Sequence, residues 1–209
     1  MKYTFISDLF EKPCPGWAGD LQYNGEWVES NPGLALDAIG HCFENADYFI
    51  NVTDPQRYAK GLQCIFSNSC SNLAFLFTKT NVGCPQKARV LSKLKFVFDN
   101  LFVKHCEHEV REIGSSSDGD LGFICYMLWD ITPIYPPNID LDVLEECVKI
   151  MKYSMSLDNE SCIISGLHGI GHWVDDLPSL AKEIDSCKME KWSHKINEYA
   201  ERAKQGGVQ

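Results

Sequence analysis

The sequence lacks the short motifs that mark several common enzyme classes. It contains no phosphate-binding P-loop, no G-x-G-x-x-G dinucleotide fingerprint and no G-x-S-x-G nucleophile elbow. The glycines of Gly166-x-x-Gly-x-Gly171 do not form such a fingerprint, because no strand is predicted before them. We therefore predict a protein that is not an enzyme, with no catalytic residues and no cofactor.

Apolar runs long enough to cross a bilayer are also missing. None reaches the roughly 18 residues that a membrane-crossing helix requires. The N-terminal segment is interrupted by Ser7-Asp8 before the apolar region of a signal peptide begins. We expect a cytoplasmic protein with no membrane partner.

The ten cysteines include no Cys-x-x-Cys pair of the kind that binds zinc or exchanges disulfides. Four of them lie inside apolar, helix-like runs: Cys64, Cys125, Cys147 and Cys162. A reduced cysteine behaves there as a small hydrophobic side chain, and the cytoplasm keeps thiols reduced. We predict reduced thiols that are mostly buried.

Basic residues are too few to balance the acidic ones, and the shortage is confined to one half of the chain. Residues 1–104 carry ten Lys and Arg against ten Asp and Glu, whereas residues 105–209 carry nine against nineteen. The excess is densest in residues 107–185, with sixteen acidic and four basic side chains. An acidic surface repels nucleic acid and anionic membranes and attracts cationic partners. The alternative, a solvated surface that only keeps the protein soluble, predicts a more even spread of charge.

Strand patterns are absent, and apolar residues recur at helical spacing along most of the chain. Asn31-Pro32, Asp54-Pro55 and Cys84-Pro85 each place a proline where a helix can start. The clearest apolar stripe runs from Val90 to Phe102. These features predict an all-α fold in which antiparallel helix pairs stack as a HEAT-like superhelix.

We expect a single α-helical domain over residues 1–209. Turn signals and isolated aromatic residues predict an irregular N-terminal arm over residues 1–31, with a short extended piece at Glu26-Trp27-Val28. The glycine-containing end, residues 205–209, is predicted to fray.

Two histidines four residues apart, His168 and His172, lie on one face of a predicted helix. Their spacing suits two zinc ligands, but the metalloprotease pattern has a glutamate after the first histidine, where this chain has Gly169. A third ligand would have to come from Asp175-Asp176 or from a distant cysteine. The other interpretation is a close helix crossing. Each glycine weakens a helix by ~1 kcal/mol relative to alanine, a cost that makes sense if another backbone approaches closely there. The histidines would then form hydrogen bonds within a helix–helix contact.

Two segments resemble stretches of known proteins: Phe123-Ile-Cys-Tyr-Met-Leu-Trp-Asp-Ile-Thr-Pro133 and Cys162-Ile-Ile-Ser-Gly-Leu-His-Gly-Ile-Gly-His-Trp173. They are similar to α-helical, HEAT-like bacterial proteins, some of which are immunity proteins of the contact-dependent growth inhibition and polymorphic toxin class. The resemblance covers about residues 120–185. It implies an all-α superhelical fold and a partner that is a toxin domain, often a nuclease, and it assigns no role to any single residue.

The acidic second half and the resemblance together predict an immunity protein that covers the active site of a basic nuclease toxin. The expected contacts are exposed acidic and aromatic residues at helix ends: Asp118, Asp120, Asp130, Glu145, Glu146, Trp173, Asp175 and Asp176. Two alternatives remain open. One is a metal-dependent hydrolase that uses His168 and His172, and the other is a helical-repeat scaffold for an unrelated partner.

Overall fold

The computed structural model describes residues 9–10, 25–114, 119–187 and 192–208. Within these ranges the regular elements are helices and no β-strand occurs, which confirms the all-α prediction. None of the described helices is long and apolar enough to cross a lipid bilayer. The α-helices are α2 (Gly25–Ser30), α3 (Pro32–Glu44), α4 (Ala46–Val52), α5 (Pro55–Phe66), α6 (Cys84–Leu91), α7 (Leu94–Val97), α8 (Val103–His105), α9 (Gly119–Met127), α10 (Leu141–Ser156), α11 (Glu160–Val174), α12 (Ala181–Cys187) and α13 (His194–Ala203). Shorter turns of helix are η1 (Leu73–Phe77), η2 (Phe98–Phe102), η3 (Pro136–Asn138) and η4 (Pro178–Leu180).

The three predicted proline starts are all present. Helices α3, α5 and α6 each carry proline in their first turn. Before α5, the Asp54 carboxylate also accepts a hydrogen bond of 2.8 Å from the backbone N–H of Arg57, which satisfies one of the unpaired donors of the first turn. The start of each helix is therefore determined by residues next to it in sequence.

The apolar stripe over Val90–Phe102 is helical, but it is not one continuous helix. The chain leaves α6 at Leu91, restarts as α7 at Leu94 and winds as the π-helix η2 before α8. Its apolar residues are still buried, among them Leu94, Val97 and Phe98. The wider turn of the π-helix keeps the same apolar face toward the core. The spacing of apolar residues alone could therefore not distinguish η2 from an α-helix.

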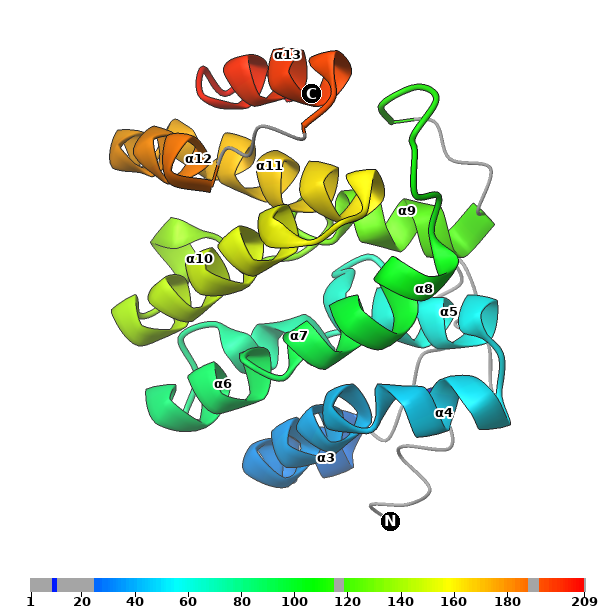
Figure 1. Cartoon of the computed structure of the whole chain (residues 1–209). Coiled ribbons are helices and arrows are strands. Elements are labelled where there is room, and N and C mark those ends of the chain that lie inside the picture. Colours follow the sequence, from blue (N-terminus) through cyan, green and yellow to red (C-terminus); the bar gives the residue numbers. More distant parts are fainter. Residues whose placement is uncertain (1–8, 11–24, 115–118, 188–191, 209) are drawn as a thin grey trace.

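The helices are stacked in successive layers (Figure 1). Helix α3 packs on α6, α6 on α10, α10 on α11, and α11 on α13, while α5, α9 and α11 form a second set of contacts. One connected hydrophobic core runs through the described layers. Each layer thus buries its apolar face mainly against the layers on either side of it.

Three glycines of α11 lie in close contact with residues from other parts of the chain. A Cβ atom at Gly166 would lie inside 3.0 Å of the Met151 backbone oxygen, a separation that real Cβ atoms do not show. A Cβ atom at Gly169 would lie 2.6 Å from Cδ1 of Trp129, and one at Gly171 would lie 2.5 Å from Cγ1 of Val208. These contacts confirm the predicted close crossing, with a different neighbour at each glycine.

Both ends of the chain differ in part from expectation. Residues Gly25–Ser30 of the expected irregular arm form helix α2, so the extended piece predicted at Glu26-Trp27-Val28 is wrong. Residues 205–209 were expected to fray, but Val208 is buried against α11 because Gly171 has no side chain there. Residues 1–8, 11–24 and 209 lie outside the described ranges.

The nine described cysteines are all present as thiols, and most of them are buried. Burial raises the pKa of the Cys147 thiol well above its usual range, with a smaller contribution from the neighbouring Glu146 carboxylate. A buried thiol in its neutral form packs as an apolar group. The prediction of mostly buried thiols is confirmed for these residues.

Candidate functional site

The carboxy-terminal end of α11 gathers most of the residues selected from the sequence. Helices α10 and α11 are joined by only three residues and run antiparallel, because Gly166, early in α11, meets Met151, late in α10. A helix rises 1.5 Å per residue, so Glu145 lies about 18 Å along α10 from the connection between the two helices. Asp175 lies about 24 Å along α11 from the same connection, in the same direction. Glu145 and Asp175 therefore lie toward the same end of the helix pair.

His168 is held at this end by a partner from another helix. Its side chain is buried, and its Nδ1 lies 2.7 Å from the hydroxyl of Tyr199 on α13. Burial, with a smaller contribution from the neighbouring His172, lowers the pKa of His168 to about 3. The imidazole is therefore neutral near pH 7. The predicted hydrogen bond within a helix–helix contact is confirmed for this residue.

His172 connects His168 to a carboxylate that reaches the site from outside α11. The Nε2 atoms of His168 and His172 are 3.1 Å apart, and the Nε2 of His172 is 3.5 Å from Oδ1 of Asp130. One ligand-type atom from each of these three residues lies within 4.8 Å of the other two. The third metal-ligand candidate is thus Asp130, which follows α9, and not the expected Asp175, Asp176 or a cysteine.

The hydrogen-bond chain continues beyond His168. The hydroxyl groups of Tyr199 and Tyr126 are 3.4 Å apart, and burial raises the pKa of the Tyr199 hydroxyl, with a further contribution from its hydrogen bond to Tyr126. The Tyr199 phenol therefore remains protonated near pH 7 and can donate a hydrogen bond. Sequence reasoning missed these tyrosines, since they come from α9 and α13, far from the histidines along the chain.

Trp173 is not a surface residue. Its side chain is 1% exposed, and its ring packs edge-on against that of Trp129. The expectation that it is exposed and contacts a partner is wrong, because Trp173 stands four residues after Gly169 and so lies on the same buried face of α11. Sequence spacing alone could have revealed this.

The remaining predicted acidic residues occupy different places. Asp130, Glu145, Asp175 and Asp176 are exposed, and Glu146 is half-buried beside Lys149. Asp120, in contrast, lies in the first turn of α9 and pairs with Lys60 at 3.3 Å. Asp118 lies outside the described residues. We call the set Asp130, Glu145, Glu146, Asp175 and Asp176 the acidic end.

Three members of the acidic end have no basic partner in the part of the chain that the structure describes. Within the described ranges, no basic side chain pairs with Glu145, Asp175 or Asp176. Two large apolar residues are exposed in the segment that leads into this part of α10: Tyr135 is 40% exposed and Leu141 67% exposed. Exposed apolar residues beside carboxylates were not predicted from the sequence.

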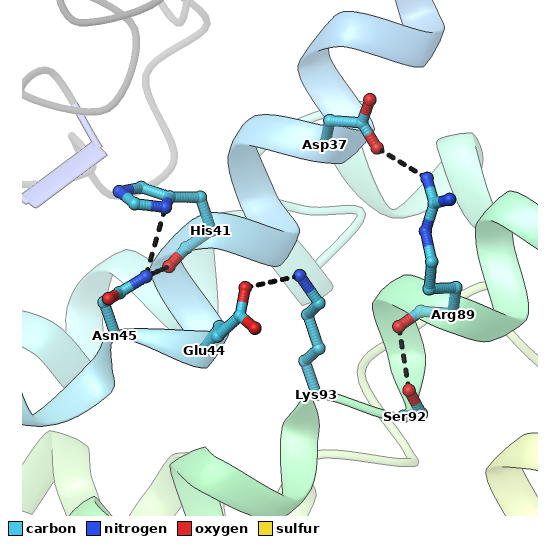
Figure 2. Close-up of polar contacts among 7 residues, drawn as sticks. All are labelled: Asp37, His41, Glu44, Asn45, Arg89, Ser92 and Lys93. Atoms are coloured by element: carbon cyan, nitrogen blue, oxygen red, sulfur yellow. Dashed lines mark hydrogen bonds and ion pairs between the residues drawn. The ribbon is translucent and has the colours of Figure 1, made fainter.

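Two carboxylates of the first half lie in ion pairs between neighbouring helices (Figure 2). Asp37 on α3 accepts a hydrogen bond from Arg89 on α6 at 3.1 Å, and Glu44 accepts one from Lys93 at 2.6 Å. Glu44 has a pKa below its usual value because Lys93 donates to it and carries the opposite charge. Asp37 and Glu44 are therefore neutralised by basic residues of an adjacent layer, whereas Glu145, Asp175 and Asp176 have no such partner among the described residues.

No family model, no curated protein and no solved structure matches this chain.

Proposed function

We propose that this protein is an immunity protein that binds a basic toxin domain, a nuclease of the polymorphic toxin class, and blocks its active site with the acidic end. The protein would be cytoplasmic. Its layered helices would form a HEAT-like superhelix whose ends are accessible to a partner. The protein would act by occupying the toxin's surface and would itself carry out no chemical step.

This proposal rests on the carboxylates of the acidic end that have no basic partner among residues 9–10, 25–114, 119–187 and 192–208. A nuclease binds nucleic acid through a positively charged cleft, and a cluster of free carboxylates is complementary to that charge. Such complementarity accelerates encounter, up to ~10⁸–10⁹ M⁻¹s⁻¹ at low salt. Paired carboxylates such as Asp37 and Glu44 could not contribute as much, because their own salt bridges already reduce their field.

The exposed apolar residues add a second feature of protein interfaces. Binding energy in such interfaces is concentrated in a few buried apolar and aromatic side chains, surrounded by a polar rim. Leu141 begins α10, and the next residue, Asp142, is exposed and acidic. Leu141 and Tyr135 would therefore be covered on binding, while the carboxylates around them steer the partner.

The test is a binding titration with the toxin domain that, on this proposal, is encoded beside the gene for this chain. Association and dissociation rates of the purified chain are measured from low to high salt. We expect one toxin domain per chain, tight binding, and an association rate that falls steeply with salt because the charges are exposed. Failure of the toxin domain to bind, or to be inhibited, contradicts the proposal.

A charge-reversed variant then tests the location. Glu145→Lys, Asp175→Lys and Asp176→Lys combined should slow association by at least about ten-fold at low salt and flatten its salt dependence. Glu26→Lys, Glu29→Lys and Asp47→Lys combined change the net charge equally, at exposed positions of α2 and α4. Equal effects of the two variants would show that only net charge matters, and would remove the acidic end as the binding surface.

A further inference from the structure

We propose that Asp130, His168 and His172 form a binding site for one divalent transition-metal ion with the ligand preference of Zn²⁺, with a fourth position open to solvent. Asp130 also belongs to the acidic end, but metal binding needs no partner protein, because all three ligands come from this chain. It joins the segment after α9 to the end of α11.

The distances between the ligand atoms support this site. In a tetrahedral zinc site with metal–ligand bonds near 2.05 Å, neighbouring ligand atoms are about 3.3 Å apart. The two Nε2 atoms are 3.1 Å apart, and the Nε2 of His172 is 3.5 Å from Oδ1 of Asp130. Two imidazole nitrogens and a carboxylate oxygen are a ligand set that zinc uses in proteins.

The second nitrogen of His168 is already oriented by a neighbour. A metal-binding histidine usually donates its other N–H to an oxygen atom, which fixes the ring and directs the free lone pair at the metal. The Nδ1 of His168 lies 2.7 Å from the Tyr199 hydroxyl, so its Nε2 faces His172. The Tyr126 hydroxyl follows at 3.4 Å from that of Tyr199. This part of the site is rigid because three helices, α9, α11 and α13, contribute to it.

An ion can reach the site from one side. His168 is buried, but the side chains of His172 and Asp130 are 24% and 37% exposed. The protein would therefore hold the metal from its buried side, and the fourth ligand would come from the solvent-exposed side, as a water molecule does in open zinc sites.

A second histidine–carboxylate pair in the chain provides an internal comparison. His194 and Glu198 on α13 are also four residues apart, with His194 Nε2 3.3 Å from Glu198 Oε1. Both side chains are exposed, at 89% and 65%, and neither belongs to a group of three candidate ligands among the described residues. His194 is therefore a matched control: a histidine beside a carboxylate on a helix, without the buried second histidine.

The experiment measures Zn²⁺ binding to the full chain without any partner protein. Chain freed of metal with a chelator is titrated with Zn²⁺ by calorimetry, and with Co²⁺ by visible absorption, which reports tetrahedral coordination. We expect one strong site per chain, tetrahedral Co²⁺ absorption and a higher Tm with Zn²⁺, because the ion binds only the folded chain.

Variants identify the ligands. Asp130→Asn and His172→Gln, both at partly exposed positions, should each weaken Zn²⁺ binding by at least about ten-fold, since even outer-shell changes reach that size. His194→Gln should bind as the wild type does. No Zn²⁺ binding at micromolar concentrations, or unchanged affinity in both ligand variants, overturns the site. Circular dichroism of each metal-free variant checks its fold, and a toxin-binding result does not affect either outcome.

Discussion

Replacing Gly166 with alanine should destabilise the protein, although alanine is the better helix former. Alanine favours a helix over glycine by about 1 kcal/mol. At Gly166 the added methyl group would collide with the Met151 backbone oxygen and Ser154 Oγ, and would lie 2.7 Å from Cγ of Met155. A backbone oxygen cannot rotate away, so α10 and α11 must separate. Overpacking of this kind destabilises by about 1–3 kcal/mol or more, and we expect the upper end of that range.

The net loss is then about 2 kcal/mol in the free energy of unfolding. For a chain of this size that corresponds to a fall in Tm of about 4–8 °C. Urea titration followed by circular dichroism measures the free energy, and a thermal melt measures Tm. Gly33→Ala in α3 is the matched control, because its Cβ would meet only the Gln86 side chain, at 3.5 Å. In the Gly33→Ala variant, the free energy of unfolding should be unchanged or rise by up to about 1 kcal/mol.

A Gly166→Ala chain as stable as wild type, or more stable, would refute the close crossing. It would mean that α10 and α11 tolerate a larger separation than the structure shows. The glycines of α11 would then have no packing role, and the position of His168 relative to α13 would have to be fixed in some other way.

Two further predictions concern other residues of α11. Glu160 accepts hydrogen bonds from the Val110 N–H and the Ser193 hydroxyl and pairs with Lys195. Burial raises its pKa, but these three partners outweigh burial and hold the pKa below its usual value. Because the folded-state pKa is lowered, the stabilisation is present above the unfolded pKa and is lost as pH falls through the folded one. Glu160→Gln should lose about 1–3 kcal/mol near pH 7, and urea titrations should show this difference shrinking below about pH 4; a difference that does not change with pH contradicts the assignment. Trp173→Ala should lose about 3–5 kcal/mol by removing a buried side chain. Trp173→Phe should lose far less, because the indole N–H has no hydrogen-bond partner in the described structure, and equal losses in thermal melts would contradict a pure packing role.

The parts of the fold that the sequence predicts well are those determined by neighbouring residues. Pro32 and Pro55 mark helix starts because proline fits the first turn and its missing N–H would be unpaired there in any case. The glycines of α11 predict a close crossing because nothing else compensates for three weak helix formers in one helix. Both predictions depend on residues that are close together in the sequence, so the residue types and their spacing are sufficient to make them.

The parts that could not be predicted depend on which segments meet in space. Asp130 lies 38 residues before His168 in the sequence, and only the packing of α9 against α11 brings it to His172. Charge alone does not show which carboxylates are paired either. Asp120 has a lysine partner from α5, whereas Asp175 has no basic partner in the described residues. Which charged residues pair across layers depends on the fold. Composition could therefore indicate that the second half is acidic, but not which of its carboxylates have a basic partner.

Hydrogen exchange of the chain with and without the proposed partner, a nuclease toxin domain, tests the central proposal most directly. Binding at the acidic end predicts slower exchange in residues 140–146 and 172–177 of the complex, where the backbone beside Leu141, Glu145 and Asp175 becomes covered. Exchange in α3 and α4 should stay unchanged. Protection confined to α3 and α4, or no protection at all, would contradict the assignment of this surface to the partner.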